Sequence, residues 1–124
     1  MFHPEKPGAE VKPEAAPLGG EPVIIKNVNS AFIGTDLEQR LRAGGVATVV
    51  IVGITTDHCV CTTARMAGNL GFTTVVVADA TATFEGCGHD GRSYSADQLH
   101  DIALASLHGE FATVVASAHW LNTR

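Results

Sequence analysis

The sequence predicts an α/β protein with a mostly parallel sheet, and three observations lead to this class. The runs 46–54 and 73–78 are almost wholly apolar and rich in β-branched residues, which is typical of strands buried on both faces. Segments with helix-start and helix-stop signals lie between such runs. The chain has 124 residues, 45% of them hydrophobic, which suffices for one small domain with its own core. Strands that alternate with helices in this way form parallel sheets with right-handed crossovers.

The N-terminal residues are expected to lie outside the sheet. Residues 1–21 are rich in Pro, Gly, Glu and Lys and have little to bury, so they are predicted to form a loop or loose arm. The short apolar run 22–26 then indicates a brief strand that ends in Lys26. We therefore expect an arm over residues 1–21 and a domain over residues 22–124.

A helix is expected next, because Thr35 and Glu38 have the spacing of a capping box and Gly44 and Gly45 stop the helix. The buried strand 46–54 follows it.

The second half of the chain repeats this alternation. A helix is expected from about Cys59 to Leu70, with Gly71 as its C-terminal cap. The strand 73–78 follows, with Asp79 at its end, and residues 80–94 are expected to form a loop.

A third helix and a last strand complete the predicted order. Ser95 and Gln98 form another capping box, ahead of a helix whose apolar face repeats at helical spacing. The last strand is predicted over residues 112–116. Ligands of parallel sheets bind at the carboxyl ends of the strands. The residues expected at those ends are Lys26, residues 55–59 and residues 79–82.

Charge and cysteine content exclude several classes of protein. There are 13 acidic and 8 basic residues and no Lys/Arg cluster, so no nucleic-acid partner is expected. No apolar run reaches the ~18 residues of a membrane span, and the N-terminus lacks the pattern of a secretory signal. We therefore expect no membrane association and a cytoplasmic location, which an odd number of cysteines also fits. Cys59 and Cys61 do not have C-x2-C zinc spacing, so we expect no metal and no other cofactor.

Cys59 is the candidate nucleophile, because it lies between a buried strand and a helix. Unpaired N–H groups and the dipole at a helix start favour a thiolate and can hold an oxyanion. From position alone, a thiol that is merely packed under the sheet is an equally good interpretation. Lys26 alone would be a solvated lysine, but beside Cys59 it could activate the thiol. Cys61 is better explained as a packed side chain, and Cys87 has no assigned role.

Two segments resemble the isochorismatase-like cysteine hydrolases, a superfamily that includes nicotinamidases, N-carbamoylsarcosine amidohydrolases and isochorismatases. Residues 52–60, VGITTDHCV, followed by Thr62-Thr63-Ala64 and Ala67, are similar to its nucleophile motif. Residues 26–37, KNVNSAFIGTDL, are similar to its lysine segment. Further likeness lies at Asp79-Ala80, Phe84, residues 104–107 and residues 110–112. The resemblance covers residues 18–121.

The resemblance implies a Rossmann-like, three-layer α/β/α fold and an Asp, Lys, Cys triad, with Cys59 as nucleophile and Lys26 as the lysine. It also implies a cis peptide bond between Ile54 and Thr55, with the backbone N–H groups of Thr55 and Cys59 forming the oxyanion hole. The family cleaves amides or related C–N bonds through a thioester. Only His3 stands where nicotinamidases carry a metal-binding Asp/His cluster, so the resemblance brings no metal site.

Compared with the family, the sequence lacks the first two strands and the Asp that ends the first. In the family's sheet order 3-2-1-4-5-6 these strands separate the lysine strand from the cysteine strand. Strand 46–54 should therefore have an open edge, and we expect a homo-oligomer, dimer or higher, in which a second copy covers it. The missing base has only weak candidate substitutes, which are a partner chain, His58, His89 or His100.

These observations predict a cysteine hydrolase that cleaves an amide or carbamoyl bond of a small molecule through a thioester on Cys59. Phe32, Phe84 and Tyr94 are weaker candidates for the lining of the substrate pocket. The alternative is a catalytically impaired, truncated member of the family, acting as an oligomeric binding or remnant protein because the Asp is absent. A third hypothesis is that the sequence is a fragment of a longer active protein.

Overall fold

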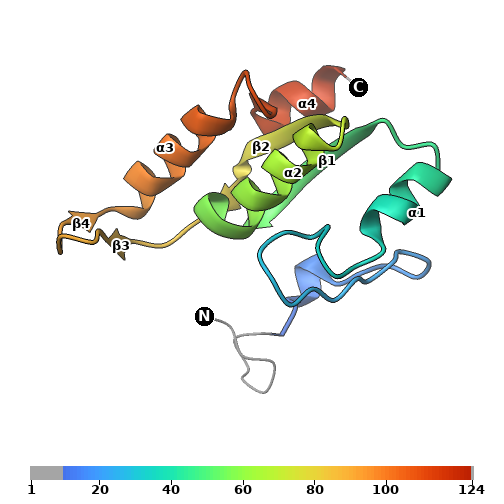
Figure 1. The fold of residues 1–124 in the computed structure, drawn as a ribbon, viewed down its shortest axis with the longest axis horizontal. Coiled ribbons are helices and arrows are strands. Elements are labelled where there is room, and N and C mark those ends of the chain that lie inside the picture. The colour runs from blue at the N-terminus through green and yellow to red at the C-terminus, as the bar shows by residue number, and fades with distance from the viewer. Residues whose placement is uncertain (1–9, 124) are drawn as a thin grey trace.

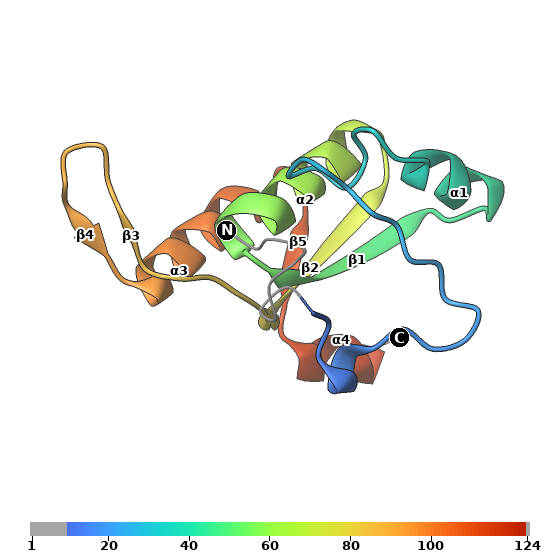
Figure 2. The same ribbon diagram turned by 90° about the horizontal axis from the view of Figure 1, so that it is seen from below.

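The computed structural model describes residues 10–123 and shows a three-stranded parallel sheet with helices on both faces (Figures 1 and 2). The strands lie in the order β1-β2-β5. They are β1 (Thr48–Ile54), β2 (Thr73–Ala82) and β5 (Thr113–Val115). The helices α2 (Cys61–Asn69) and α3 (Ala96–Leu107) cover one face, and α4 (Ser117–Thr123) packs on the other. The predicted α/β class and the parallel sheet are confirmed.

β2 is the centre of the sheet and is buried on both faces, as its apolar run predicted. Val75, Val76 and Val77 are buried in succession, with no more than 6% of any of them exposed. Burial of a valine side chain stabilises a fold by about 1.5–3 kcal/mol, so this strand is a main source of stability. The core that surrounds Val76 consists of Val60, Ala64, Leu104, Leu107 and Ala112.

β1 differs from the prediction, because only one of its faces is covered. Ile51 packs against the core, whereas Val50, Val52 and Ile54 are 40%, 57% and 50% exposed. The physical reason is that α4 packs on β2, which leaves the outer face of β1 open. β1 also pairs with β2 alone, and its other edge has no strand partner among residues 10–123.

Residues 22–26 form no strand, so this expectation was wrong. Val23 and Ile25 are 68% and 80% exposed, and no strand within residues 10–123 pairs with the segment. Residues 10–21 are exposed and irregular apart from a 3-10 turn at Pro13–Ala15. Residues 1–9 of the expected arm lie outside the described residues, and a division at residue 21 stays a prediction.

The two predicted capping boxes have different outcomes. At α1 (Leu37–Ala43) the N-cap is Asp36, whose side chain makes no capping hydrogen bond, and Thr35 Oγ1 accepts from Leu37 N instead. At α3 the box is complete: Ser95 Oγ accepts from Gln98 N, and Gln98 Oε1 accepts from Ser95 N.

The segment predicted as a loop over 80–94 contains ordered structure. β2 continues to Ala82, and β3 (Gly86–Cys87) pairs with β4 (Ser93–Tyr94) in a short antiparallel hairpin. The hairpin projects away from the sheet beside the start of α3 (Figures 1 and 2).

Asp79 lies within β2 and not at its end, and it holds α4, a helix that the sequence analysis did not predict. Asp79 Oδ1 accepts from Ser117 N at 2.8 Å, and Oδ2 accepts from Ser117 Oγ at 2.6 Å. These hydrogen bonds, led by that from the Ser117 hydroxyl, hold the pKa of Asp79 below its usual value. Asp79 therefore caps the start of α4.

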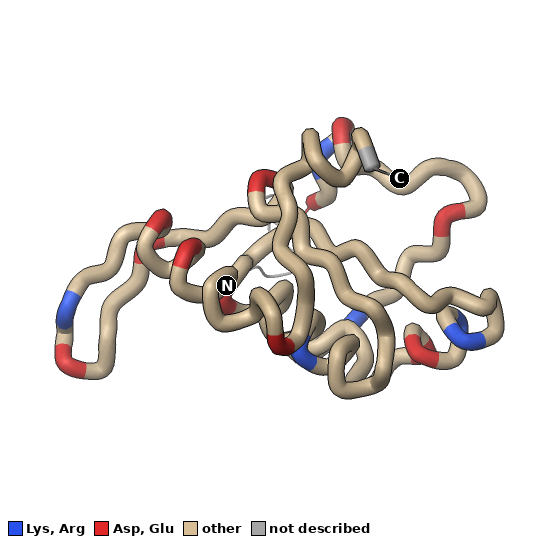
Figure 3. Tube along the Cα trace, turned by 90° about the horizontal axis from the view of Figure 1, so that it is seen from above, with Lys and Arg blue, Asp and Glu red and all other residues tan. Residues whose placement is uncertain are grey.

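Charged residues are distributed over the described surface. Lys and Arg occur at several separate places along the trace, among more numerous Asp and Glu (Figure 3). None of the helices described in residues 10–123 has the length and apolar character needed to cross a bilayer.

Helix α2 lies close against the residues before β5 at Gly68. A Cβ atom at Gly68 would lie 2.8 Å from the Phe111 carbonyl oxygen, closer than a carbon and an oxygen pack. Only glycine therefore fits at this point of the helix.

Gly68→Ala is expected to destabilise the protein by about 1–3 kcal/mol through this backbone clash. In a helix with space around the residue, the same change would stabilise the protein by ~1 kcal/mol. The sign of the change in the free energy of unfolding therefore shows whether the clash is present. Urea denaturation measures the free energy of unfolding. Gly19→Ala is the control, because nothing lies within 4 Å of its added Cβ. Equal or higher stability of Gly68→Ala would contradict the close packing.

Candidate active site

Cys59 lies in a π-helical turn, Thr56–Val60, that leads from β1 into α2. The peptide bond between Ile54 and Thr55 is cis, as the family resemblance implied. Just before it, Gly53 has a φ of 120°, which glycine adopts readily and other residues rarely. The pairing of β1 with β2 also changes register between Ile51 and Gly53. The chain therefore leaves the regular ladder immediately before the turn that carries Cys59.

Lys26 lies beside Cys59 although it is 33 residues earlier in the chain. Lys26 Nζ donates to Cys59 Sγ at 3.2 Å and to the carbonyl oxygen of Val28 at 2.9 Å. Asn29 Nδ2 lies 3.7 Å from the same sulfur. An ammonium group at this distance stabilises negative charge on sulfur. The structure thus brings together the two residues that the resemblance singled out.

The residues after Lys26 are held against α2 by side-chain contacts. Ala31 N donates to Thr63 Oγ1 of α2 at 3.0 Å, and Ser30 is buried. The Phe32 ring stacks on Phe72, with centroids 6.1 Å apart. These contacts, and not strand pairing, fix the position of the lysine segment.

A cleft of about 710 Å³ opens at Cys59. One wall comes from the β3–β4 hairpin, which contributes Tyr94. Phe84 and Tyr94, two of the three aromatic residues expected near a substrate, line this cleft, and their role stays a prediction. The remaining lining residues are Asn29, Ile54, Thr55, Asp57, His58, Thr83, Glu85, Gly86, Cys87, Gly88 and Leu99.

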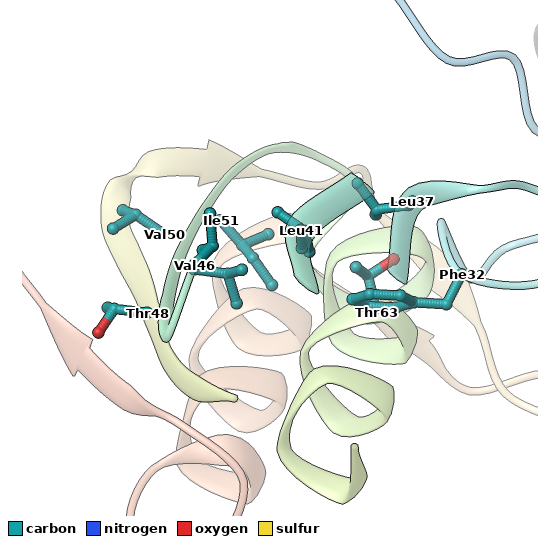
Figure 4. Close-up of a pocket in the computed structure, with 9 residues that line it drawn as sticks. Phe32, Leu37, Leu41, Val46, Thr48, Val50, Ile51 and Thr63 are labelled. Atoms are coloured by element: carbon teal, nitrogen blue, oxygen red, sulfur yellow. The ribbon is translucent and has the colours of Figure 1, made fainter. Parts of the chain in front are cut away.

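Phe32 does not line the cleft at Cys59, contrary to expectation. It lines a separate apolar cavity of about 360 Å³ between α1, β1 and α2, where Figure 4 shows it beside Thr63, with Leu37 and Leu41 nearby. The reason is its stacking on Phe72, which draws the ring into the packing of the lysine segment.

The three histidines proposed as weak substitutes for a base lie in different places. His58 lines the cleft, with Nε2 3.9 Å from Asp57 Oδ2. His89 is exposed on the hairpin and is not among the residues that line the cleft. His100 Nδ1 is hydrogen-bonded to the buried Thr56 Oγ1 at 2.7 Å. His100 therefore ties α3 to the turn that carries Cys59.

Two polar residues of the cleft were quoted within the motifs but given no role, Asn29 and Asp57. Asp57 Oδ1 accepts a hydrogen bond from Thr83 Oγ1, so the carboxylate is held in the cleft wall. The signal that could have found Asp57 was its place inside the motif 52–60, just after the end of a predicted strand. Thr55 Oγ1 is buried and has no hydrogen-bond partner among residues 10–123. A buried hydroxyl without a partner is costly, so a bound ligand or water would gain by reaching it.

The two remaining cysteines, Cys61 and Cys87, lie in different surroundings. Cys61 packs against the core and accepts from Arg65 Nε at 3.3 Å, which agrees with its interpretation as a packed side chain. Cys87 is exposed on the hairpin, and its Sγ donates to Gly91 O. Within residues 10–123 no three His, Cys, Asp or Glu side chains are grouped closely enough to hold a metal ion.

Comparisons with known proteins decide the family. The Isochorismatase domain family matches residues 1–119. An uncharacterized isochorismatase family protein of Bacillus subtilis (strain 168) is 47% identical over 122 residues, which are 98% of this chain and 65% of that protein. This chain belongs to the isochorismatase family.

Other members extend the likeness. The crystal structure of an isochorismatase-family protein from Chromobacterium violaceum ATCC 12472 superposes with a TM-score of 0.92 at 46% identity, covering 98% of this chain and 63% of that one. Maleamate amidohydrolase of Pseudomonas putida is 37% identical over 85 residues, 68% of this chain and 40% of that enzyme. This member of the family therefore spans less than two thirds of the length of these relatives.

Thr56→Val is expected to lower the free energy of unfolding by about 1–3 kcal/mol, because it leaves His100 Nδ1 without its partner at a part-buried site. The substitution keeps the shape of the side chain. A double-mutant cycle with His100→Ala should give a coupling energy of about 0.5–3 kcal/mol. Thr62→Val, at an exposed position of α2, is the control. Additive effects of Thr56→Val and His100→Ala would show that the two residues do not interact.

Proposed function

We propose that this chain is a hydrolase that cleaves an amide or carbamoyl C–N bond of a small molecule through a thioester on Cys59. The observation that carries the proposal is the Lys26 ammonium, 3.2 Å from Cys59 Sγ at an open cleft. Membership in the isochorismatase family and the likeness to an amidohydrolase support the type of reaction. The aromatic and polar lining of the cleft suits a small organic substrate.

In the proposed reaction the Cys59 thiolate, stabilised by Lys26, attacks the carbonyl carbon of the substrate. The electrons of the C=O bond move to its oxygen, and the backbone N–H groups of Thr55 and Cys59 donate hydrogen bonds to that oxyanion. When the oxyanion collapses, the C–N bond breaks, and the Lys26 ammonium is the proton donor at hand for the leaving amine. Water then attacks the thioester carbonyl and gives a proton to the now neutral Lys26 amine, the C–S bond breaks, and the acid, the Cys59 thiolate and the Lys26 ammonium are restored.

A second candidate function is an oligomeric binding or remnant protein without turnover. One observation favours it: among residues 10–123, the side chains hydrogen-bonded to Cys59 Sγ are Lys26 and Asn29, and neither is a carboxylate that could accept the thiol proton.

Hydrolysis of a panel of small amides and carbamoyl compounds separates the two functions. Cys59→Ala is expected to abolish turnover, and Lys26→Met to lower kcat/KM at least about tenfold, since it removes the charge beside the sulfur. Lys26→Met should also slow alkylation of Cys59 by iodoacetamide at pH 7. Lys12→Met, at an exposed position far from Cys59 in the sequence, is the matched control.

Turnover that survives in Cys59→Ala would refute the thioester. A folded wild-type chain that hydrolyses none of the compounds would support the second function.

We further propose that the protein is a cytoplasmic homo-oligomer, dimer or higher, in which the free edge and exposed outer face of β1 are covered by a second copy. Val52→Lys, which adds a charge on that face, is expected to shift the protein towards monomer in sedimentation velocity. Val11→Lys, at an exposed position outside the sheet, controls for the added charge. A wild-type chain that sediments as a monomer would contradict the proposal.

A further inference from the structure

The charged side chains that line the cleft at Cys59 are carboxylates. Asp57 and Glu85 both line it, and among residues 10–123 no Lys or Arg does. The nearest cation is Lys26, whose ammonium donates to Cys59 Sγ and to the Val28 carbonyl oxygen. A thiolate on Cys59 balances this ammonium, so the two carboxylates determine the charge that the rest of a substrate meets.

The two carboxylates come from different segments of the chain. Asp57 precedes the nucleophile in the turn after β1, and its side chain is 22% exposed. The hydrogen bond from Thr83 Oγ1 fixes its orientation, and the nearby His58 Nε2 lies 3.9 Å from its other oxygen. Glu85 lies just before the β3–β4 hairpin and is exposed. Because one carboxylate is partly shielded from solvent, its field is less screened than that of a surface charge.

Aromatic side chains line the cleft together with these carboxylates. Phe84 precedes Glu85, and Tyr94 faces the cleft from β4. The faces of aromatic rings attract cations, and carboxylates reinforce that preference. The carboxylates repel an anionic group.

We propose that this cleft selects amides whose non-reacting end is neutral or cationic, such as an ammonium, and rejects amides that carry a carboxylate. This inference rests on the proposed hydrolase function, because it concerns the same cleft. Glu85 and Asp57 are then the residues that determine specificity, and Cys59 with Lys26 performs the reaction on whatever they admit.

The first test compares three amides of similar size: β-alaninamide, which is cationic, butyramide, which is neutral, and succinamate, which is anionic. The expected kcat/KM of the cationic and neutral amides exceeds that of succinamate at least about tenfold. Glu85→Gln and Asp57→Asn should each lower the ratio of kcat/KM for β-alaninamide to kcat/KM for succinamate roughly three- to tenfold. Asp90→Asn is the matched control: Asp90 lies outside the lining, and an asparagine oxygen can still accept from Arg92 N. A preference for succinamate in the wild type would overturn the inference and leave the hydrolase function intact.

The second test does not need turnover. In a Cys61→Ser, Cys87→Ser background, Cys59 is labelled with methanethiosulfonates that carry a trimethylammonium, a methyl or a sulfonate group. The cationic-to-anionic rate ratio is expected to fall roughly three- to tenfold in Glu85→Gln and in Asp57→Asn, and to stay unchanged in Asp90→Asn. If no amide is hydrolysed, the proposed function fails while this ratio still tests the charge of the cleft. A ratio that neither cleft variant changes would overturn the inference.

Discussion

The hydrogen bond between Lys26 Nζ and Cys59 Sγ is the constraint on which the site depends, because it joins two segments that no strand pairing connects. The segment before Lys26 is exposed and irregular, so the lysine is positioned from its C-terminal side only. The bond from Ala31 N to Thr63 and the stacking of Phe32 on Phe72 fasten that side to the helix layer. Side-chain packing therefore fixes the position of Lys26, whereas strand hydrogen bonds would fix a residue at the end of a strand.

Local signals predicted those elements whose causes are local. The apolar run of β2 and the capping box of Ser95 and Gln98 appear in the structure as the sequence indicates, because burial on both faces and a reciprocal cap need nothing remote. The failures occur where a distant partner decides. Within the described part of the chain, residues 22–26 have the composition of a strand but no strand to pair with, and no layer covers the second face of β1. Helix α4 begins where Asp79, 38 residues earlier, supplies the cap, and no local pattern marks that.

That Lys26 and Cys59 lie side by side was predictable, since both stand in motifs with a fixed order, and the cis peptide bond before the turn was implied by the same resemblance. The composition of the cleft wall was less predictable. Asp57 and Asn29 stand inside the recognised motifs, but only the fold shows that their side chains lie with Cys59. Phe32 was misplaced for the opposite reason: an aromatic residue near the lysine in sequence was assigned to the cleft, whereas its ring packs on Phe72.

The β3–β4 hairpin has a consequence for how this scaffold can change. It contributes one wall of the cleft, yet it is held by few contacts: Gly86 pairs with Tyr94, Cys87 pairs with Ser93, and Gly88 N donates to Arg92 O. The turn that carries Cys59 is instead fastened to α3 through Thr56 and His100 and to the lysine segment through Lys26 and Cys59. Neither of these contacts involves the hairpin. Insertions or substitutions in the hairpin can change the shape of the cleft at little cost to the stability of the core. In proteins with this fold, the shape of the cleft can therefore change while the arrangement of Lys26 and Cys59 is kept.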